Sequence, residues 1–305
     1  MRTSVADVST NTQSVVARRG LSQTLAPYLE LTKPRVTSMV LLTTAAGYYL
    51  GSSRDISIGG LLCVLVGTGL LAGGTAVLNQ FMERDADRLM RRTARRPLPA
   101  GKVTPQQALH YGMLLVSLGT IFLLASTNVL TAFLGWLTSV VYLLIYTPMK
   151  TRSPWCTLIG AVPGAIPPVM GWTAARGALT MEAVVLFGIL FCWQFPHFLA
   201  IAWVYREDYE RGGFQMLPRG ERRGTWMGLA ILLFSILLLP VSFAPYWLGL
   251  DGSMYMLASA VLGSGFLLFS LNVARLQTRF SARRLLQSSV AYLPFLLLFL
   301  TIGKL

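Results

Sequence analysis

Long apolar runs separated by shorter polar segments recur along this chain. Many of these runs approach the ~20 residues that a helix needs to cross a bilayer. Backbone N–H and C=O groups inside a bilayer need partners within the protein, so the runs are expected to be helical. The pattern predicts an all-α membrane protein with nine transmembrane helices, near residues 36–52, 59–81, 108–125, 128–146, 157–175, 182–204, 226–248, 254–273 and 286–303.

Composition and charge agree with this prediction. Hydrophobic residues make up 54% of the 305 residues and charged residues only 12%, about half the charged fraction of an ordinary soluble domain. The net charge of +14 does not indicate nucleic-acid binding, because 23 of the 26 Lys and Arg residues precede the first helix or follow helices two, four, six and eight. The positive-inside rule then places the N-terminus in the cytoplasm and the C-terminus outside, which requires an odd number of helices.

The N-terminal segment is polar and lacks the apolar core of a signal peptide. We predict that residues 1–30 form a disordered cytoplasmic tail and that residues 31–305 form one membrane domain. The start of the chain is also compatible with a weak mitochondrial presequence, but a bacterial inner membrane is favoured. Cys63, Cys156 and Cys192 are isolated from one another in sequence and are expected to fill the core.

Polar residues at the end of the second predicted helix give the most specific chemical signal. Asn79, Glu83 and Asp87 are spaced four apart, so they share one helix face. One carbonyl oxygen and two carboxylates suit Mg²⁺, which commonly also binds substrate phosphates. Arginines that follow can bind phosphates through forked hydrogen bonds. These arginines are Arg84, Arg88, Arg91, Arg92, Arg95 and Arg96. The pairing favours diphosphate chemistry at a bilayer face, and a solvated basic loop is the ordinary alternative.

A second loop repeats this order of acids, basic residues and Leu-Pro-x-Gly, 119 residues later. Glu207, Asp208 and Glu210 precede the Leu-Pro-Arg-Gly of residues 217–220. Membrane proteins built from duplicated halves often place their site between the halves. Asp208 is the best candidate for a further metal ligand, because it lies at the end of an aromatic-rich helix. Glu207 and Glu210 are interpreted as charged surface residues.

The aromatic-rich helix, residues 191–209, contains His197 in an otherwise apolar membrane segment. A polar group there is costly and by default indicates function, although a hydrogen-bonded core histidine is the alternative. Nearby aromatic side chains can wall a site for a large flat substrate or face an allylic cation, or they can simply pack. The pocket candidates are Trp193, Phe195, Phe198, Trp203 and, at the end of the fourth helix, Tyr146.

A third segment, residues 146–172, begins at the same membrane face as the two acidic loops. Lys150 and Arg152 follow Tyr146 directly and are expected to face the acids. Glycines and prolines interrupt the helix that follows. Such interruptions mark close helix packing or the wall of a cavity.

These segments together resemble the intramembrane prenyltransferases of the UbiA superfamily, and within it the haem branch, the protohaem IX farnesyltransferases. The resemblance covers the chain from Leu31 onward. The stretch WQFPHF at 193–198 separates the haem branch from relatives that prenylate quinone precursors. The matching segments are LTKPRVT (31–37), NQFMERDADRLMRRTARRPLPAG (79–101), YTPMKTRSPW (146–155), GAIPPVMGW (164–172) and WQFPHFLAIAWVYREDYERGGFQMLP (193–218).

The resemblance implies a nine-helix bundle with a large lateral cavity and a Mg²⁺-dependent reaction of a prenyl diphosphate. The implied metal ligands are Asn79, Glu83, Asp87 and Asp208. The implied diphosphate-binding residues are Arg84, Lys150 and Arg152. His197 matches the histidine that is specific to the haem branch. The chain reads Asn79-Gln80-x-x-Glu83 where the superfamily has Asn-Asp-x-x-Asp, which leaves the number of metal ions open.

The implied reaction transfers farnesyl from farnesyl diphosphate to a vinyl group of haem B, with addition of water, giving haem O and diphosphate. Haem B is then a substrate and Mg²⁺ the cofactor, with membrane lipid around the protein and haem A synthase as a partner. The family does not decide whether His197 ligates iron, orients haem or positions water. A prenyltransferase for a quinone precursor is the nearest alternative. A secondary transporter is disfavoured, because the acids lie at helix ends and not near the midplane.

Overall fold

The computed structural model describes residues 21–53, 55–218 and 224–304, and these are almost entirely helical. Residues 1–20 of the predicted tail lie outside the described residues, whereas residues 21–31 form a helix. Tyr28 anchors that helix edge-to-face on Tyr111, with ring centroids 5.3 Å apart, and Leu31 is fully buried. The helices are α1 (Leu21–Leu31), α2 (Pro34–Gly51), α3 (Ile58–Leu89), α4 (Pro105–Ser126), α5 (Val129–Val140), the π-helix η1 (Val141–Tyr146), α6 (Thr147–Met149), α7 (Cys156–Ala165), α8 (Pro167–Arg176), α9 (Met181–Val204), α10 (Arg206–Arg211), α11 (Thr225–Trp247), α12 (Ser253–Leu276) and α13 (Arg279–Ile302).

Eight segments of the described chain are long and apolar enough to cross a membrane. The first predicted helix, 36–52, exists as α2 but is not among these eight segments, and it contains Arg35 and three threonines. The chain is therefore a multi-pass membrane protein. The eight segments are Ile58–Leu89, Pro105–Ser126, Val129–Met149, Cys156–Arg176, Met181–Val204, Thr225–Trp247, Ser253–Leu276 and Arg279–Ile302.

Two of the predicted helices are interrupted, and both interruptions have local causes. The fourth runs from α5 through the π-helix η1 into α6, and π-segments inside helices are frequent at functional sites. The fifth is divided into α7 and α8 at Ile166, because Pro167 and Pro168 supply no backbone N–H for helical hydrogen bonds. The two interrupted helices lie on either side of the segment around Lys150.

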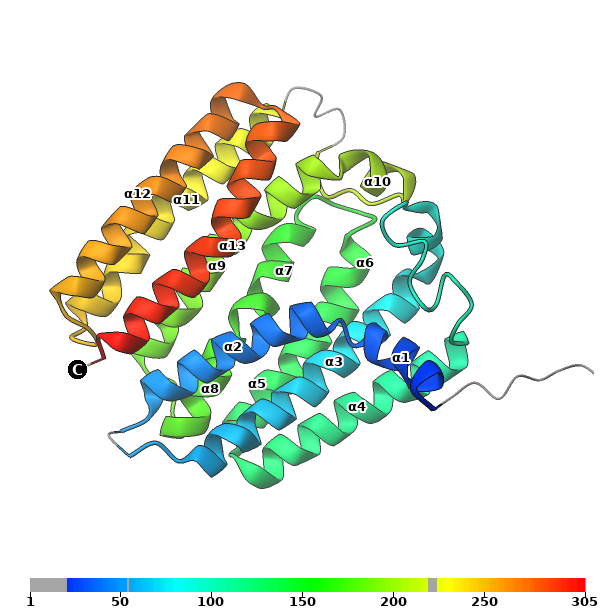
Figure 1. The fold of residues 1–305 in the computed structure, drawn as a ribbon, viewed down its shortest axis with the longest axis horizontal. Helices are drawn as coiled ribbons and strands as arrows, with labels where there is room; N and C mark the ends of the chain where they lie inside the picture. Colours follow the sequence, from blue (N-terminus) through cyan, green and yellow to red (C-terminus); the bar gives the residue numbers. More distant parts are fainter. Residues whose placement is uncertain (1–20, 54, 219–223, 305) are drawn as a thin grey trace, which may run out of the picture.

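The helices pack as one bundle with its polar loops at one end. Figure 1 shows α9, α11, α12 and α13 on one side and α3, α4 and α5 on the other. Helix α2 packs closely against α8 and also against α3. The loop after α3, the short helix α6 and α10 lie at the same end of the bundle (Figure 1). The fold therefore brings the acidic and basic segments of distant parts of the chain together.

Close contact between α2 and α8 depends on glycines. A Cβ atom on Gly171 of α8 would overlap the backbone carbonyl of Thr44 on α2. We expect Gly171→Ala to cost about 1–3 kcal/mol of stability, because the helices must separate to admit a methyl group. The measurement is thermal unfolding of the purified protein in detergent.

The matched control is Gly265→Ala on α12, where an added Cβ meets nothing within 4 Å. Alanine replaces glycine there without overlap and reduces the entropy of the unfolded chain, so stability should be kept or slightly raised. Equal unfolding temperatures for the two variants would contradict the packing argument.

Candidate active site

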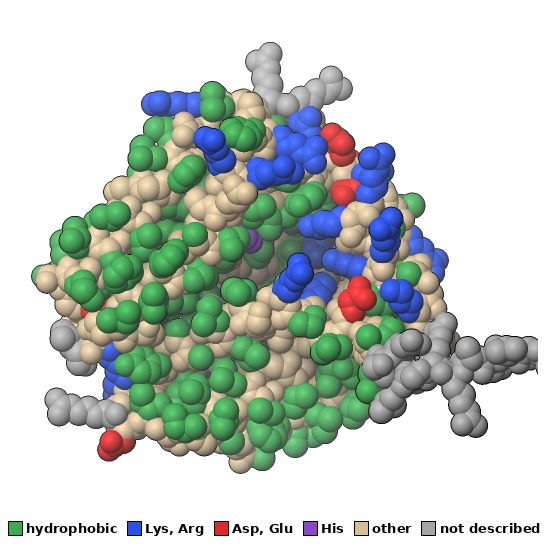
Figure 2. All heavy atoms as spheres, in the orientation of Figure 1, with side chains coloured by type: hydrophobic (Ala, Val, Ile, Leu, Met, Phe, Trp, Pro, Cys, Tyr) green, Lys and Arg blue, Asp and Glu red, His purple; other side chains and the backbone are tan. Residues whose placement is uncertain are grey.

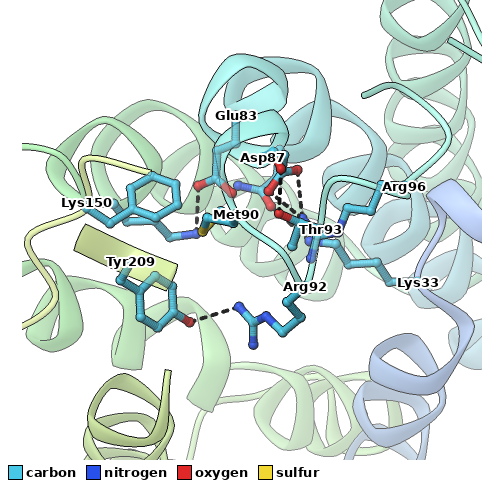
Figure 3. Close-up of a pocket in the computed structure, with 11 residues that line it drawn as sticks. Lys33, Glu83, Asp87, Met90, Arg92, Thr93, Arg96, Lys150 and Tyr209 are labelled. Atoms are coloured by element: carbon cyan, nitrogen blue, oxygen red, sulfur yellow. Dashed lines mark hydrogen bonds and ion pairs between the residues drawn. The ribbon is translucent and has the colours of Figure 1, made fainter. Parts of the chain in front are cut away.

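Asn79, Glu83 and Asp87 lie on one buried face of α3, as their spacing predicts. All three line a cavity of about 140 Å³ at the loop end of the bundle. Figure 3 shows that Glu83 and Asp87 point toward side chains that come from the loop after α3, from the α1–α2 junction and from Lys150. The cavity lining is Lys33, Asn79, Glu83, Asp87, Met90, Arg92, Thr93, Arg96, Lys150, Tyr209 and Phe214.

Each of the three oxygen-bearing side chains of α3 is paired with a cation. Lys33 Nζ donates to Asn79 Oδ1 at 3.0 Å, and Lys150 Nζ lies 2.7 Å from Glu83 Oε1. Arg96 Nη1 contacts both oxygens of Asp87, at 2.9 and 2.7 Å. Four cationic side chains line the cavity with only two carboxylates. The cavity therefore has a surplus of positive charge and is suited to bind an anion.

The two lysines of the cavity differ in their electrostatics. Burial, followed by repulsion from Arg96, lowers the pKa of Lys33 to about 7. Burial also opposes the charge of Lys150, but the adjacent Glu83 outweighs it, so the pKa of Lys150 lies well above its ordinary value. The Lys150 ammonium also lies 4.6 Å from the centre of the Tyr146 ring. Lys150 is therefore a permanent cation of this site.

Lys33 also has an unusual backbone conformation. It sits just before α2 in the left-handed region, with φ 50° and ψ 62°. A non-glycine residue there is uncommon, and such strain clusters at functional sites. Sequence reasoning did not propose Lys33 as a site residue, and it did not select Arg96 as a diphosphate-binding residue. The signal for Lys33 was its place in the segment LTKPRVT, whereas Arg96 was one of six arginines that the sequence could not tell apart.

The segment after α9 closes one side of the cavity. Arg92 Nη2 donates to the Tyr209 hydroxyl at 3.2 Å, and its guanidinium lies 4.7 Å from the centre of the Tyr205 ring. Gln215 N donates to Lys150 O at 2.6 Å, which joins this segment to the one that follows α6. The two loops that repeat the same sequence order therefore meet around one cavity.

Asp208 does not line this cavity, although it contacts the backbone of Arg91, the residue before Arg92 of the cavity lining. Its Oδ1 accepts a hydrogen bond from Arg91 N at 3.1 Å and pairs with Arg211. Burial opposes its charge, but the hydrogen bonds from Arg211 and the Arg91 backbone outweigh it and hold the pKa of Asp208 below its ordinary value. Asp208 thus connects α10 to the segment after α3.

Two predicted diphosphate-binding arginines also lie outside the cavity lining. Arg84 donates to Phe81 O at 2.8 Å and contacts Asp85 at the surface. Arg152 is exposed. Of the three predicted basic residues, the structure places Lys150 alone in the cavity.

The predicted aromatic residues form two separate groups. Trp193 stacks on His197 with ring centroids 4.8 Å apart, and Phe198 meets the same imidazole edge-on at 5.5 Å. Phe195 stacks on Phe234 inside the bundle, and Trp203 is buried beneath the guanidinium of Arg206. Trp193, His197 and Phe198 are half-buried, whereas Phe195 and Trp203 are buried.

The face shown in Figure 2 is hollowed near its centre, between α13 and α2. Histidine atoms are visible in the hollow, and Lys and Arg side chains gather along the adjacent rim (Figure 2). The walls around the hollow are largely hydrophobic (Figure 2). This arrangement offers a polar, cationic end and an apolar body to one elongated ligand.

The oxygens of the cavity fit a hard divalent cation. Mg²⁺ is commonly held by one or two carboxylates, with substrate phosphates and water as the other ligands. Asn79 Nδ2 donates to Thr147 Oγ1 at 3.1 Å, which leaves the amide oxygen facing Lys33 and the cavity. No group of three His, Cys, Asp or Glu side chains within the described ranges is placed to hold a metal ion. Such an ion would therefore depend on Asn79 and on substrate oxygens.

Comparison with known proteins identifies the family. The sequence profile of the UbiA prenyltransferase family matches residues 40–300. The chain is 45% identical over 278 residues to the protoheme IX farnesyltransferase of Solibacter usitatus, covering 88% of this chain and 95% of that protein. It is 44% identical over 291 residues to the protoheme IX farnesyltransferase of Koribacter versatilis, covering 92% and 94%.

Solved structures show the same fold. A digeranylgeranylglyceryl phosphate synthase matches with a TM-score of 0.78 at 19% identity, over 92% of this chain and 98% of that one. A UbiA homologue from Archaeoglobus fulgidus, bound to DMAPP and Mg²⁺, matches with a TM-score of 0.64 at 16% identity, over 88% and 99%. The predicted fold and family are confirmed. The chain belongs to the UbiA prenyltransferase family, within its protoheme IX farnesyltransferase branch.

Proposed function

We propose that this protein transfers the farnesyl group of farnesyl diphosphate to a vinyl group of protohaem IX, with addition of water, to give haem O and diphosphate. The observation that carries the proposal is the cavity in which Asn79, Glu83 and Asp87 meet Lys33, Lys150, Arg92 and Arg96. Relatives at 44–45% identity that carry this activity in their names support the choice of substrates.

The diphosphate is proposed to bind among the four cationic side chains of the cavity. Mg²⁺ held by Asn79, Glu83 and Asp87 would supply neutralisation of the phosphate charge. Lys150 and Arg96 exchange part of their contact with the carboxylates for contact with phosphate oxygens. Arg92, held in place by Tyr209 of α10, contacts the diphosphate from the loop after α3. Cations fixed in this way stabilise the charge that grows on the leaving group without reorganising.

The bond changes follow from this binding mode. The C–O bond between farnesyl and diphosphate breaks, and both electrons leave with the diphosphate. The vinyl π electrons form a C–C bond to the farnesyl carbon, and the cation left beside the macrocycle takes up water and loses a proton. Aromatic faces near His197 can stabilise the allylic cation while this occurs.

The orientation in the membrane is part of the same proposal. Lys and Arg side chains gather at the end of the bundle that carries the cavity (Figure 2). The positive-inside rule then favours a cytoplasmic cavity and N-terminus, with the C-terminus outside, in a bacterial inner membrane. Water-soluble Mg²⁺ would reach the cavity from the cytoplasm, and farnesyl diphosphate would reach it from the lipid or cytoplasmic side.

Turnover of haem B with farnesyl diphosphate by purified protein tests the function. We expect a haem product whose mass is increased by one farnesyl group and one hydroxyl group, and we expect EDTA to abolish it and Mg²⁺ to restore it. Mass spectrometry of extracted haem provides the measurement. A folded preparation that binds both substrates without forming this product, or that prenylates a quinone precursor in its place, would contradict the proposal.

A further inference from the structure

One residue of α13 holds two rings of α9. Ser289 Oγ lies 2.8 Å from His197 Nδ1, and the Ser289 carbonyl accepts a hydrogen bond from Trp193 Nε1 at 2.9 Å. Trp193 stacks on the same imidazole at an interplanar angle of 21°. Ser289 is fully buried, so these contacts are made away from water. The plane of the imidazole is therefore fixed both by its hydrogen bond and by its stacking partner.

The position of one proton follows from the second hydrogen bond of Ser289. Its hydroxyl donates to Leu286 O at 2.7 Å, so its single proton is used along α13. The lone pairs of the same oxygen face His197 Nδ1, which must then be the donor. A neutral imidazole carries one proton, and it is on Nδ1 here. Nε2 is left with a free lone pair.

Nothing else in the described parts of the chain uses that lone pair. The hydrogen bond of His197 runs through Nδ1, and its other contacts are the rings of Trp193 and Phe198. The imidazole is half-buried, in a bundle whose hollow contains histidine atoms (Figure 2). A histidine whose Nδ1–H is held by a protein oxygen, with Nε2 free, has the arrangement of a metal-ligating histidine.

We propose that Ser289 is a positioning residue that fixes His197 as the Nδ1–H tautomer and presents Nε2 as a ligand to the iron of protohaem IX. This inference rests on the proposed function, because haem is the substrate. The hydrogen bond that Nδ1–H donates to Ser289 Oγ makes the imidazole more basic, which strengthens its bond to iron. Iron ligation would hold the macrocycle so that one vinyl group faces the farnesyl carbon.

The test compares the binding of haem and of metal-free protoporphyrin IX to the purified protein. We expect His197→Ala to lose the histidine–iron stretching band in the resonance Raman spectrum of the ferrous complex. Ser289→Ala is expected to weaken haem binding about tenfold and to lower the frequency of that band. Ser289→Thr, which keeps the hydroxyl, is expected to restore both. Metal-free protoporphyrin should bind all four proteins equally.

Ser288→Ala is the matched control, because Ser288 makes the same bond to the third residue before it, Leu285 O, at 2.8 Å. It is expected to leave the band and the affinity unchanged. A histidine–iron band that persists in His197→Ala, or a band frequency and haem affinity unchanged in Ser289→Ala, would overturn the inference even while haem O is formed. A protein that neither binds haem nor forms haem O would overturn the proposed function as well.

Discussion

Replacement of Asp87 by alanine is expected to reduce farnesyl transfer at least about a hundredfold, which is the usual cost of removing one preorganised charge or donor from a site. Asp87 is fully buried on α3 and meets Arg96 through both carboxylate oxygens. Its loss removes a proposed Mg²⁺ ligand and also the ion pair that positions the Arg96 guanidinium. Turnover measured by mass spectrometry of the haem product checks this expectation, and the variant should still insert into the membrane.

Asp85→Ala is the matched control for this variant. Asp85 lies two residues earlier on the same helix, its side chain is 73% exposed, and it forms surface ion pairs with Arg84 and Arg88. Surface ion pairs of this kind contribute about 0–1 kcal/mol, so activity and stability should remain close to those of the wild type. Full activity in Asp87→Ala, or equal losses in the two variants, would contradict the assignment of Asp87 to the site.

Replacement of Lys150 by methionine is expected to reduce both turnover and stability. The Lys150–Glu83 pair is largely buried, with side-chain exposures of 12% and 8%. Removing one partner of a buried ion pair leaves an unpaired charge and costs about 3–5 kcal/mol. The loss of a cation near the leaving diphosphate should reduce turnover about a hundredfold or more. Thermal unfolding and turnover are measured on the same preparation.

A double variant separates the two effects. Glu83→Gln combined with Lys150→Met removes the unpaired charge, so stability should return toward that of the wild type. Turnover should stay low, because the cation is still missing and Glu83, a proposed Mg²⁺ ligand, has lost its carboxylate. Lys102→Met, at an exposed lysine in the loop after α3, is the control and should be neutral. A double variant that regained both stability and turnover would show that Lys150 only neutralises Glu83.

The spacing of residues along one helix was sufficient to predict the acidic face of the site. Asn79, Glu83 and Asp87 belong to a single helix, so a separation of four residues fixes their common direction. The apolar runs likewise predicted the spans, and eight of the nine predicted helices are long and apolar enough to cross a membrane within the described chain. Asp208 and Arg152 lie outside the cavity, in or beside loops whose path depends on tertiary contacts. Arg84 lies outside it as well, because its side chain on α3 contacts Phe81 O and Asp85.

The sequence by itself determined that this protein is a helical membrane protein of the prenyltransferase type. The hydropathy of a membrane span depends only on the residues of that one segment, so it can be obtained from the sequence. A backbone inside the bilayer must also form its hydrogen bonds within the protein, which requires each span to be helical. Only the tertiary structure decided which polar side chains meet: Lys33 with Asn79, Arg96 with Asp87 and Ser289 with His197. The Lys33 and Ser289 contacts join residues 46 and 92 positions apart, so they depend on how the helices pack and not on any local pattern.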